Sequence, residues 1–221
     1  MLARDAEERL RVGPRLYLRR FRRADVERMQ SWRPYEELLF LPYNMPKGSR
    51  RENDDWFERN VIRSGRRYFA LARRDDGQLV GVISLREVRK STHPASARLG
   101  ITLGAQFVGQ GYGTEGLALF LDCFFGEMGF GVMRLDVAAF NGRAIRVYEK
   151  LGFQMVERFY SSPSGTRYPT PEVSGGDEHF VQHRGEHLTL HYEMELTQEA
   201  WRVRRAAVFR ALEVRYCQAG P

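Results

Sequence analysis

The stretch GQGYGTEG, Gly109–Gly116, decides how the rest of the chain is interpreted. Gly111, Gly113 and Gly116 follow the spacing G-x-G-x-x-G, and Asp136 lies 20 residues further on, as in a dinucleotide-binding fingerprint. Glycines so placed let successive backbone N–H groups converge, and the positive end of a following helix favours an anion. The stretch therefore predicts a phosphate cradle, and its surroundings decide which kind.

The surroundings argue against a dinucleotide. In that fold the glycines directly follow the first strand, and the acidic residue ends the second strand. Here the segment GAQFV separates Leu103, which ends a predicted strand, from Gly109. Asp136 lies near the start of its strand, which ends at Asn141. A nucleoside-triphosphate loop is excluded as well, because no Gly-Lys-Ser/Thr follows the glycines.

Hydrophobic periodicity outside the cradle indicates helices and strands in mixed order. Leu117, Phe120, Leu121 and Phe124 recur at i, i+3, i+4 and i+7, which predicts a helix packed on a sheet. Predicted strands span 15–21, 68–74, 79–88, 97–104, 132–141, 153–159 and 187–196, and predicted helices 25–32, 53–62, 114–129, 142–152 and 198–217. The hairpin turn at 75–77 begins an antiparallel meander, which argues against repeating βαβ units.

Composition is that of an ordinary globular chain. Its 221 residues, 43% hydrophobic, are enough to bury the core of one domain. The net charge is +7 with only three lysines, and such a surface favours nucleic acid, membrane headgroups or phosphorylated ligands without choosing among them. Cys123 and Cys217 fit no metal or redox spacing. The charged N-terminus and the lack of a long apolar run predict a cytoplasmic protein without a membrane span.

Two motifs carry a resemblance to a known family. The stretch 99–153 resembles the GNAT superfamily of acetyl-CoA-dependent N-acetyltransferases, whose motifs are Q/R-x-x-G-x-G/A and later N-x-x-A-x-x-x-Y-x-x-x-G-F. Asn141, Ala144, Tyr148 and Gly152–Phe153 match the second motif throughout. The opening RLYLRRFRRADVERMQSW resembles the branch that includes ribosomal-protein N-terminal acetyltransferases. Val108 departs from the first motif, which places Gln or Arg there, and predicts weaker or rearranged pyrophosphate binding.

The resemblance implies an α+β fold. It has a central mixed, mostly antiparallel sheet of about seven strands, flanked by helices, with its middle strands splayed apart. One domain is expected over 1–221, with an inserted loop at 160–186 and a C-terminal helix at 198–217. Relatives border the acceptor site where this insertion joins the last two strands, so it is either a lid or specificity loop or a plain surface loop.

The implied reaction moves acetyl from acetyl-CoA to a primary amine, of a small molecule or a protein N-terminus, by direct attack in a ternary complex. Tyr148 would donate a proton to the departing thiolate, although a core tyrosine has the same spacing. An N–H near Leu103 would polarise the thioester carbonyl. The implied cofactor-binding residues are Ile101, Thr102, Leu103, Gly109, Gln110, Gly111, Tyr112, Gly113, Thr114, Asn141, Ala144 and Tyr148. Asn141 is also a candidate helix cap.

The general base is not identified. Many relatives carry Glu in the strand where this chain has Arg98. Glu87 and His93 are candidates, although both are expected to face solvent, and a water chain could serve instead. The missing base and Val108 keep open a catalytically weak sensor of acyl-CoA. The positive charge keeps open a ribosome- or RNA-associated module.

Four histidines, at 179, 183, 187 and 191, recur every fourth residue. On a helix they would form a metal-binding face, but Gly185 interrupts any helix there. From His187 the pattern alternates, which directs Leu188 and Leu190 inward and His187 and His191 outward. No metal is expected. The expected partner is the amine acceptor, without membrane or nucleic acid, and a homodimer is left open. The arginines of the last helix are expected to form a solvated face.

Overall fold

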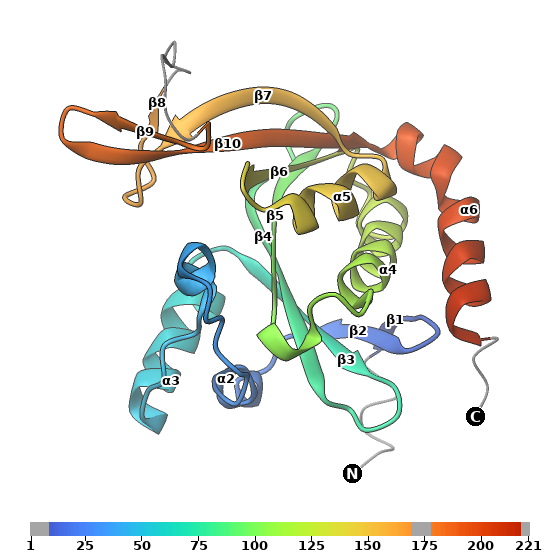
Figure 1. Ribbon diagram of the computed structural model, residues 1–221. Coiled ribbons are helices and arrows are strands. Elements are labelled where there is room, and N and C mark those ends of the chain that lie inside the picture. The colour runs from blue at the N-terminus through green and yellow to red at the C-terminus, as the bar shows by residue number, and fades with distance from the viewer. Residues whose placement is uncertain (1–8, 169–177, 218–221) are drawn as a thin grey trace.

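The computed structural model describes residues 9–168 and 178–217. Within them one sheet of ten strands runs in the order β1-β2-β3-β4-β5-β6-β10-β7-β8, and β9 pairs with β10 (Figure 1). The strands are β1 (Arg9–Val12), β2 (Leu16–Arg20), β3 (Arg67–Arg73), β4 (Leu79–Arg89), β5 (Ser96–Leu103), β6 (Val132–Ala138), β7 (Gln154–Ser161), β8 (Arg167–Tyr168), β9 (Phe180–His183) and β10 (Glu186–Thr197). All neighbours are antiparallel except β5 and β6.

The helices are α2 (Ala24–Gln30), α3 (Arg50–Phe57), α4 (Tyr112–Gly126), α5 (Gly142–Leu151) and α6 (Gln198–Cys217), with short turns η1 (Leu38–Tyr43), η2 (Glu58–Ile62) and η3 (Ala105–Phe107). The predicted α+β class is confirmed, and each of the seven predicted strands is present. The sheet is larger than predicted by three strands, β1, β8 and β9, which were missed because they are too short to show a period. Part of the stretch 160–186, expected as a loop, is therefore strand.

Helices cover both faces of the sheet. Helices α4 and α6 lie on one side and α2 and α3 on the other (Figure 1). Leu117, Phe120 and Phe124 of α4 are at most 1% exposed, which confirms the predicted helix face. Because of the second layer, β2 is not half-buried as its alternation indicated: Arg19 is also buried and its guanidinium donates to Asp25 at 2.7 Å.

The central strands separate. Strands β5 and β6 pair only over Ser96–Arg98 and Val132–Arg134, and the rest of β5 continues without this partner. The splay that the resemblance implied is therefore present. Beyond it, β7 and β10 form a long hairpin that extends past the rest of the sheet, with β8 and β9 at its far end (Figure 1). Among the described residues, no helix is long and apolar enough to cross a membrane.

Candidate active site

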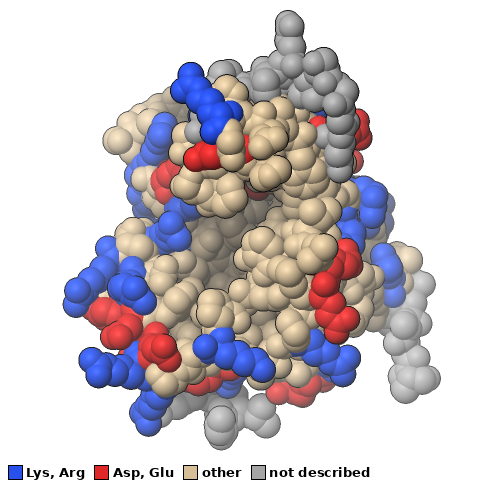
Figure 2. All heavy atoms as spheres, turned by 60° about the vertical axis from the view of Figure 1, so that its left-hand side comes forward, with Lys and Arg blue, Asp and Glu red and all other residues tan. Residues whose placement is uncertain are grey.

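A cavity of about 700 Å³ opens at the splay. Its lining comes from β4, β5 and β6, from the helices α4 and α5 on one face, and from η1 and α3 on the other. Figure 2, turned to bring the η1 side forward, shows this face hollowed at its centre, with mainly uncharged residues around the hollow. We call the part of the cavity at the glycine-rich loop the loop end, and the part lined by aromatic rings near η1 the ring end.

The loop end is shaped by two left-handed glycines. Gly109 has φ of 77° and Gly111 has φ of 83°, a conformation that side chains disfavour. Helix α4 begins directly afterwards, at Tyr112. Val108, Gly109, Gly111, Gly113 and Thr114 all line the cavity, so the first turn of α4 faces into it. The partial positive charge of that helix end favours an anion there.

Two residues of the predicted cradle direct their side chains elsewhere. Gln110 Nε2 donates to the carbonyl of Gln106 at 2.6 Å. The Tyr112 ring is buried under the Arg15 guanidinium, which lies 4.2 Å from its centroid. At these two positions only the backbone is available to bind a ligand at the loop end. Glu115, fully buried, accepts from the backbone N–H of Arg15 at 2.7 Å and so ties α4 to the start of β2.

Strand β5 presents backbone groups to the cavity, which Ile101, Thr102 and Leu103 all line. Gly104 N–H donates to Val80 of β4 at 3.1 Å. Because backbone groups of successive strand residues point to opposite sides, those of Ile101 and Leu103 point toward the splay. The Tyr35 hydroxyl donates to the Leu103 carbonyl at 2.9 Å, as this direction requires.

Helix α5 contributes the residues of the second motif. The Asn141 side chain accepts from Ala144 N–H at 3.2 Å, so Asn141 is the cap of the helix as well as a lining residue. Tyr148 lines the cavity and is only 7% exposed. Burial, with a smaller contribution from neighbouring Tyr43, raises the pKa of Tyr148 above its ordinary value. Its phenol is therefore protonated at neutral pH.

Four basic residues of the helices line the cavity and are absent from the motif. Arg143, Arg146 and Lys150 of α5 and Arg215 of α6 all line it. The first three are spaced i, i+3 and i+7, so the sequence alone could have predicted that they share one helix face. Arg215 could not be placed that way, because α6 is distant in sequence and reaches the cavity only through the fold.

The ring end contains aromatic residues that sequence reasoning did not find. Its lining rings are Tyr35, Phe40, Tyr43, Trp56 and Tyr68. The first three lie in the stretch 33–48, where Pro34, Pro42 and Pro46 interrupt any helical pattern and no helix or strand was predicted. Their signal, three aromatic residues within a short segment, has no period to interpret.

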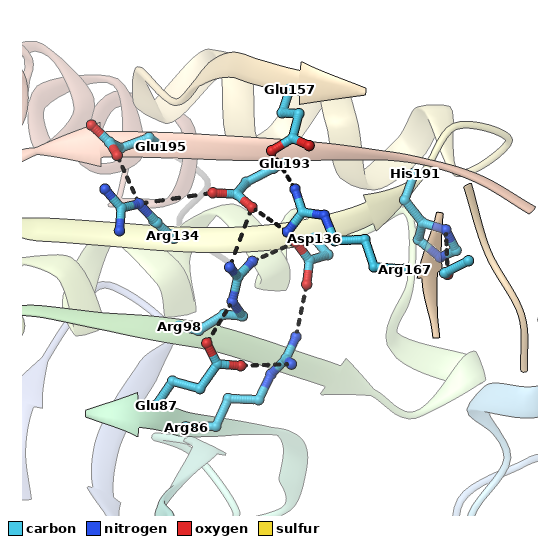
Figure 3. Close-up of polar contacts among 11 residues, drawn as sticks. Arg86, Glu87, Arg98, Arg134, Asp136, Glu157, Arg167, His191, Glu193 and Glu195 are labelled. Atoms are coloured by element: carbon cyan, nitrogen blue, oxygen red, sulfur yellow. Dashed lines mark hydrogen bonds and ion pairs between the residues drawn. The ribbon is translucent and has the colours of Figure 1, made fainter. Parts of the chain in front are cut away.

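Charged side chains form a network beside the ring end (Figure 3). Arg98 donates to Asp136 at 2.5 Å and to Glu193 at 3.2 Å. Arg86 donates to Asp136 at 3.2 Å, and Arg167 of the insertion donates to Glu193 at 2.9 Å. Burial lowers the pKa of Arg98, but the charges of Asp136 and Glu193 outweigh it and the net shift is upward. Burial likewise raises the pKa of Glu193, yet its arginine partners lower it overall.

The candidate bases lie outside the cavity. Glu87 and His93 are both exposed and neither lines it. Glu87 instead accepts from Arg98 at 3.3 Å. Arg98, at the place of the glutamate found in relatives, is thus a network residue.

The histidines form no metal site. His187 is exposed, as expected, but His191 is half-buried and stacks on Phe159 with ring centroids 5.6 Å apart. His191 lies on the face opposite to Leu188 and Leu190, as predicted, but that face is less exposed than expected because Phe159 and Ser161 contact the ring. Burial lowers the pKa of His191. Within the described parts of the chain, no group of three or more His, Cys, Asp or Glu is arranged to hold a metal ion.

Comparisons with known proteins agree with this architecture. A sequence model of the GNAT acetyltransferase domain matches residues 15–154. No curated protein matches the chain. Among solved structures, a chimera of spermidine N-acetyltransferase from Vibrio cholerae and hSSAT superposes with a TM-score of 0.61 at 20% identity, over 84% of this chain and 97% of that chain. The Vibrio cholerae spermidine N-acetyltransferase in complex with CoA and spermine gives 0.61 at 19% identity, over the same 84% and 97%.

A GNAT-family acetyltransferase from Bacillus anthracis gives a TM-score of 0.60 at 17% identity, over 85% of this chain and 98% of that chain. At such identities the likeness shows the fold, whereas the domain match covers well over half of the chain. The chain therefore belongs to the GNAT family of acetyltransferases.

Proposed function

We propose that the protein transfers acetyl from acetyl-CoA to a primary amine by direct attack in a ternary complex. One observation carries the proposal: a single cavity extends from the glycine loop, through the splay, to the ring end. Two substrates could meet at Leu103 and Tyr148, which both line it. Holding both reactants in one cavity makes their reaction effectively unimolecular.

The loop end would hold the pyrophosphate. Backbone N–H groups of Gly109–Thr114 and the first turn of α4 provide the donors. Arg146 and Lys150 of α5 and Arg215 of α6 add positive charge to the cavity lining. Because most of this recognition comes from the backbone, Val108 is compatible with binding.

The centre of the cavity would carry the chemistry. The Leu103 N–H, directed at the splay, would polarise the thioester carbonyl as negative charge develops on its oxygen. Tyr148 would then protonate the departing thiolate, since its raised pKa keeps the phenol protonated. The amine attacks in its uncharged form, and its surplus proton leaves through water in the cavity.

Thiol release from acetyl-CoA with a panel of amines tests this proposal. We expect turnover by the native protein and a loss of about 100-fold in kcat for Tyr148→Phe, the typical contribution of one general acid. Tyr160→Phe is the matched control, because Tyr160 is equally buried but does not line the cavity. The proposal fails if neither acetyl-CoA nor a longer acyl-CoA raises the melting temperature.

A second candidate function is a sensor that binds acyl-CoA without turnover. Val108 favours it, and so does Asp136, the one carboxylate among the described lining residues, because Arg86 and Arg98 both donate to it. The sensor predicts a melting-temperature rise with acetyl-CoA, together with no thiol release for any amine. An RNA-binding role has less support, because Arg202 and Arg205 of α6 pair with Glu199 and Asp122 and Arg215 lines the cavity.

A further inference from the structure

The walls of the ring end restrict which amine can bind. We propose that the acceptor is a small amine with an aromatic or bulky apolar body and a single positive charge, and that polyamines are rejected. This inference rests on the proposed acetyl transfer and specifies its substrate class. It follows from two features of the cavity, its rings and its charges.

The rings form an apolar wall made of two groups. Tyr35, Phe40 and Tyr43 contact one another with centroids 5.9 to 6.3 Å apart. Trp56 and Tyr68 form a second group, with ring centroids 6.0 Å apart and arranged edge to face. Aromatic pairs prefer this range of separations, so a ring on the acceptor could join either group. Such a wall stabilises a planar apolar body by burying its surface.

The described residues that line the cavity offer no unused negative charge. Asp136 is the only acidic residue among the described residues that line it. Its carboxylate already accepts from Arg98 at 2.5 Å and from Arg86 at 3.2 Å. Figure 3 shows both guanidinium groups directed at it. An incoming ammonium would have to displace an arginine to gain this partner.

All other charged lining residues are basic: Arg86, Arg143, Arg146, Lys150 and Arg215. One of them reaches the rings, since the Arg143 guanidinium lies 4.6 Å from the centroid of Phe40. A polyamine would bring two or more further ammonium groups into this field, where an unpaired buried charge is strongly disfavoured. A single ammonium can rest against an aromatic face and must lose its proton before it attacks.

Steady-state kinetics with tryptamine, 2-phenylethylamine, spermidine and a short peptide with a free N-terminus test the inference. At saturating acetyl-CoA we expect kcat/KM for the two aromatic amines to exceed that for spermidine and the peptide by about 10-fold or more. A larger kcat/KM for spermidine or for the peptide overturns the inference while leaving acetyl transfer intact. Turnover of no amine at all overturns the proposed function and the inference together.

Two variants test whether the arginines are the cause of the expected rejection of polyamines. Arg86→Gln removes one of the two cations on Asp136, and Arg143→Gln removes the cation beside Phe40. For each, the ratio of kcat/KM for spermidine to that for tryptamine should rise about 10-fold, through a lower KM for spermidine. Arg89→Gln is the control, since Arg89 is exposed on the same strand and does not line the cavity. An acetyl-CoA-induced melting shift shows that each variant is folded. An unchanged ratio in both variants contradicts the inference.

Discussion

The two ends of the cavity are built by different means. The loop end is built mainly from backbone: left-handed glycines, the first turn of α4 and the uncovered edge of β5. The ring end is built from side chains, with aromatic walls and one carboxylate held by two arginines. Backbone recognition tolerates many sequences, whereas side-chain recognition changes with each substitution. The loop end therefore carries the motif of the family, whereas the ring end depends on individual side chains.

The largest effect is expected at the loop end, from Gly111→Ala. A Cβ there would lie 1.9 Å from the hydroxyl oxygen of Tyr216, and φ is 83°. We expect the free energy of unfolding to fall by about 1 to 3 kcal/mol. Because the displaced backbone would supply the proposed pyrophosphate donors, kcat/KM for acetyl-CoA should fall by about 100-fold or more.

Gly126→Ala is the matched control for that variant, since a Cβ added at this helical residue would meet nothing within 4 Å. It should keep full activity and be equally or more stable. Urea unfolding and acetyl-CoA kinetics measure both. Similar losses in the two variants would contradict backbone recognition at the loop end.

An intermediate effect is expected at the ring end, from Phe140→Ala. Phe140 lies between Phe40 of η1, at 5.7 Å, and Phe180 of β9 in the insertion, at 6.0 Å. Removing the middle ring separates the insertion from η1 and loosens the mouth of the cavity. We expect KM for the amine to rise about 10-fold and KM for acetyl-CoA to stay unchanged, since ring contacts of this kind contribute about 1 kcal/mol each.

Phe209→Ala, a ring on α6 that contacts Trp201 away from the cavity, is the control for Phe140→Ala. The insertion acts as a specificity element if only Phe140→Ala changes amine KM. A change in KM for acetyl-CoA instead would mean that the two ends are not separate.

The pH dependence of stability tests the environment of Tyr148, which lies between the two ends. The pKa of Tyr148 is raised in the folded protein, so the contribution of the neutral phenol to stability is complete below the unfolded pKa of about 10. It is lost as the pH rises above that value, by up to about 1.4 kcal/mol per unit. Urea unfolding from pH 8 to 11 should show an alkaline decline that Tyr148→Phe reduces. A loss of kcat below pH 9 that disappears in the same variant would argue against a raised pKa.

The smallest effect is expected from Val108→Gln, which restores the residue usual in the first motif. One neutral hydrogen bond contributes about 0.5 to 1.5 kcal/mol, so KM for acetyl-CoA should fall by only about 3-fold. A fall of about 100-fold would show that a side chain dominates the loop end. Val108→Leu, similar in polarity, should leave KM unchanged.

Much of the fold and of the loop end could be predicted, because their signals are local. Periodicity located α4 and the seven longer strands, and the motifs located Gly109–Thr114 and Tyr148. A local signal was also missed: Ser49 and Glu52 form a capping box that starts α3 at Arg50, before the predicted Asn53. Strand β8 has two residues and β9 four, too few to show alternation, and both exist through pairing with β7 and β10.

The sequence by itself determined the elements and the phosphate cradle, because a glycine turn or a helix period depends on residues within a few positions. Only the tertiary structure decided the acceptor half of the site. Asp136 is neutralised by arginines 38 and 50 residues away in the chain, and the register of β4, β5 and β6 brings them together. The rings of η1 and α3 face the cavity only because both segments fold against the face of the splayed sheet that α4 does not cover.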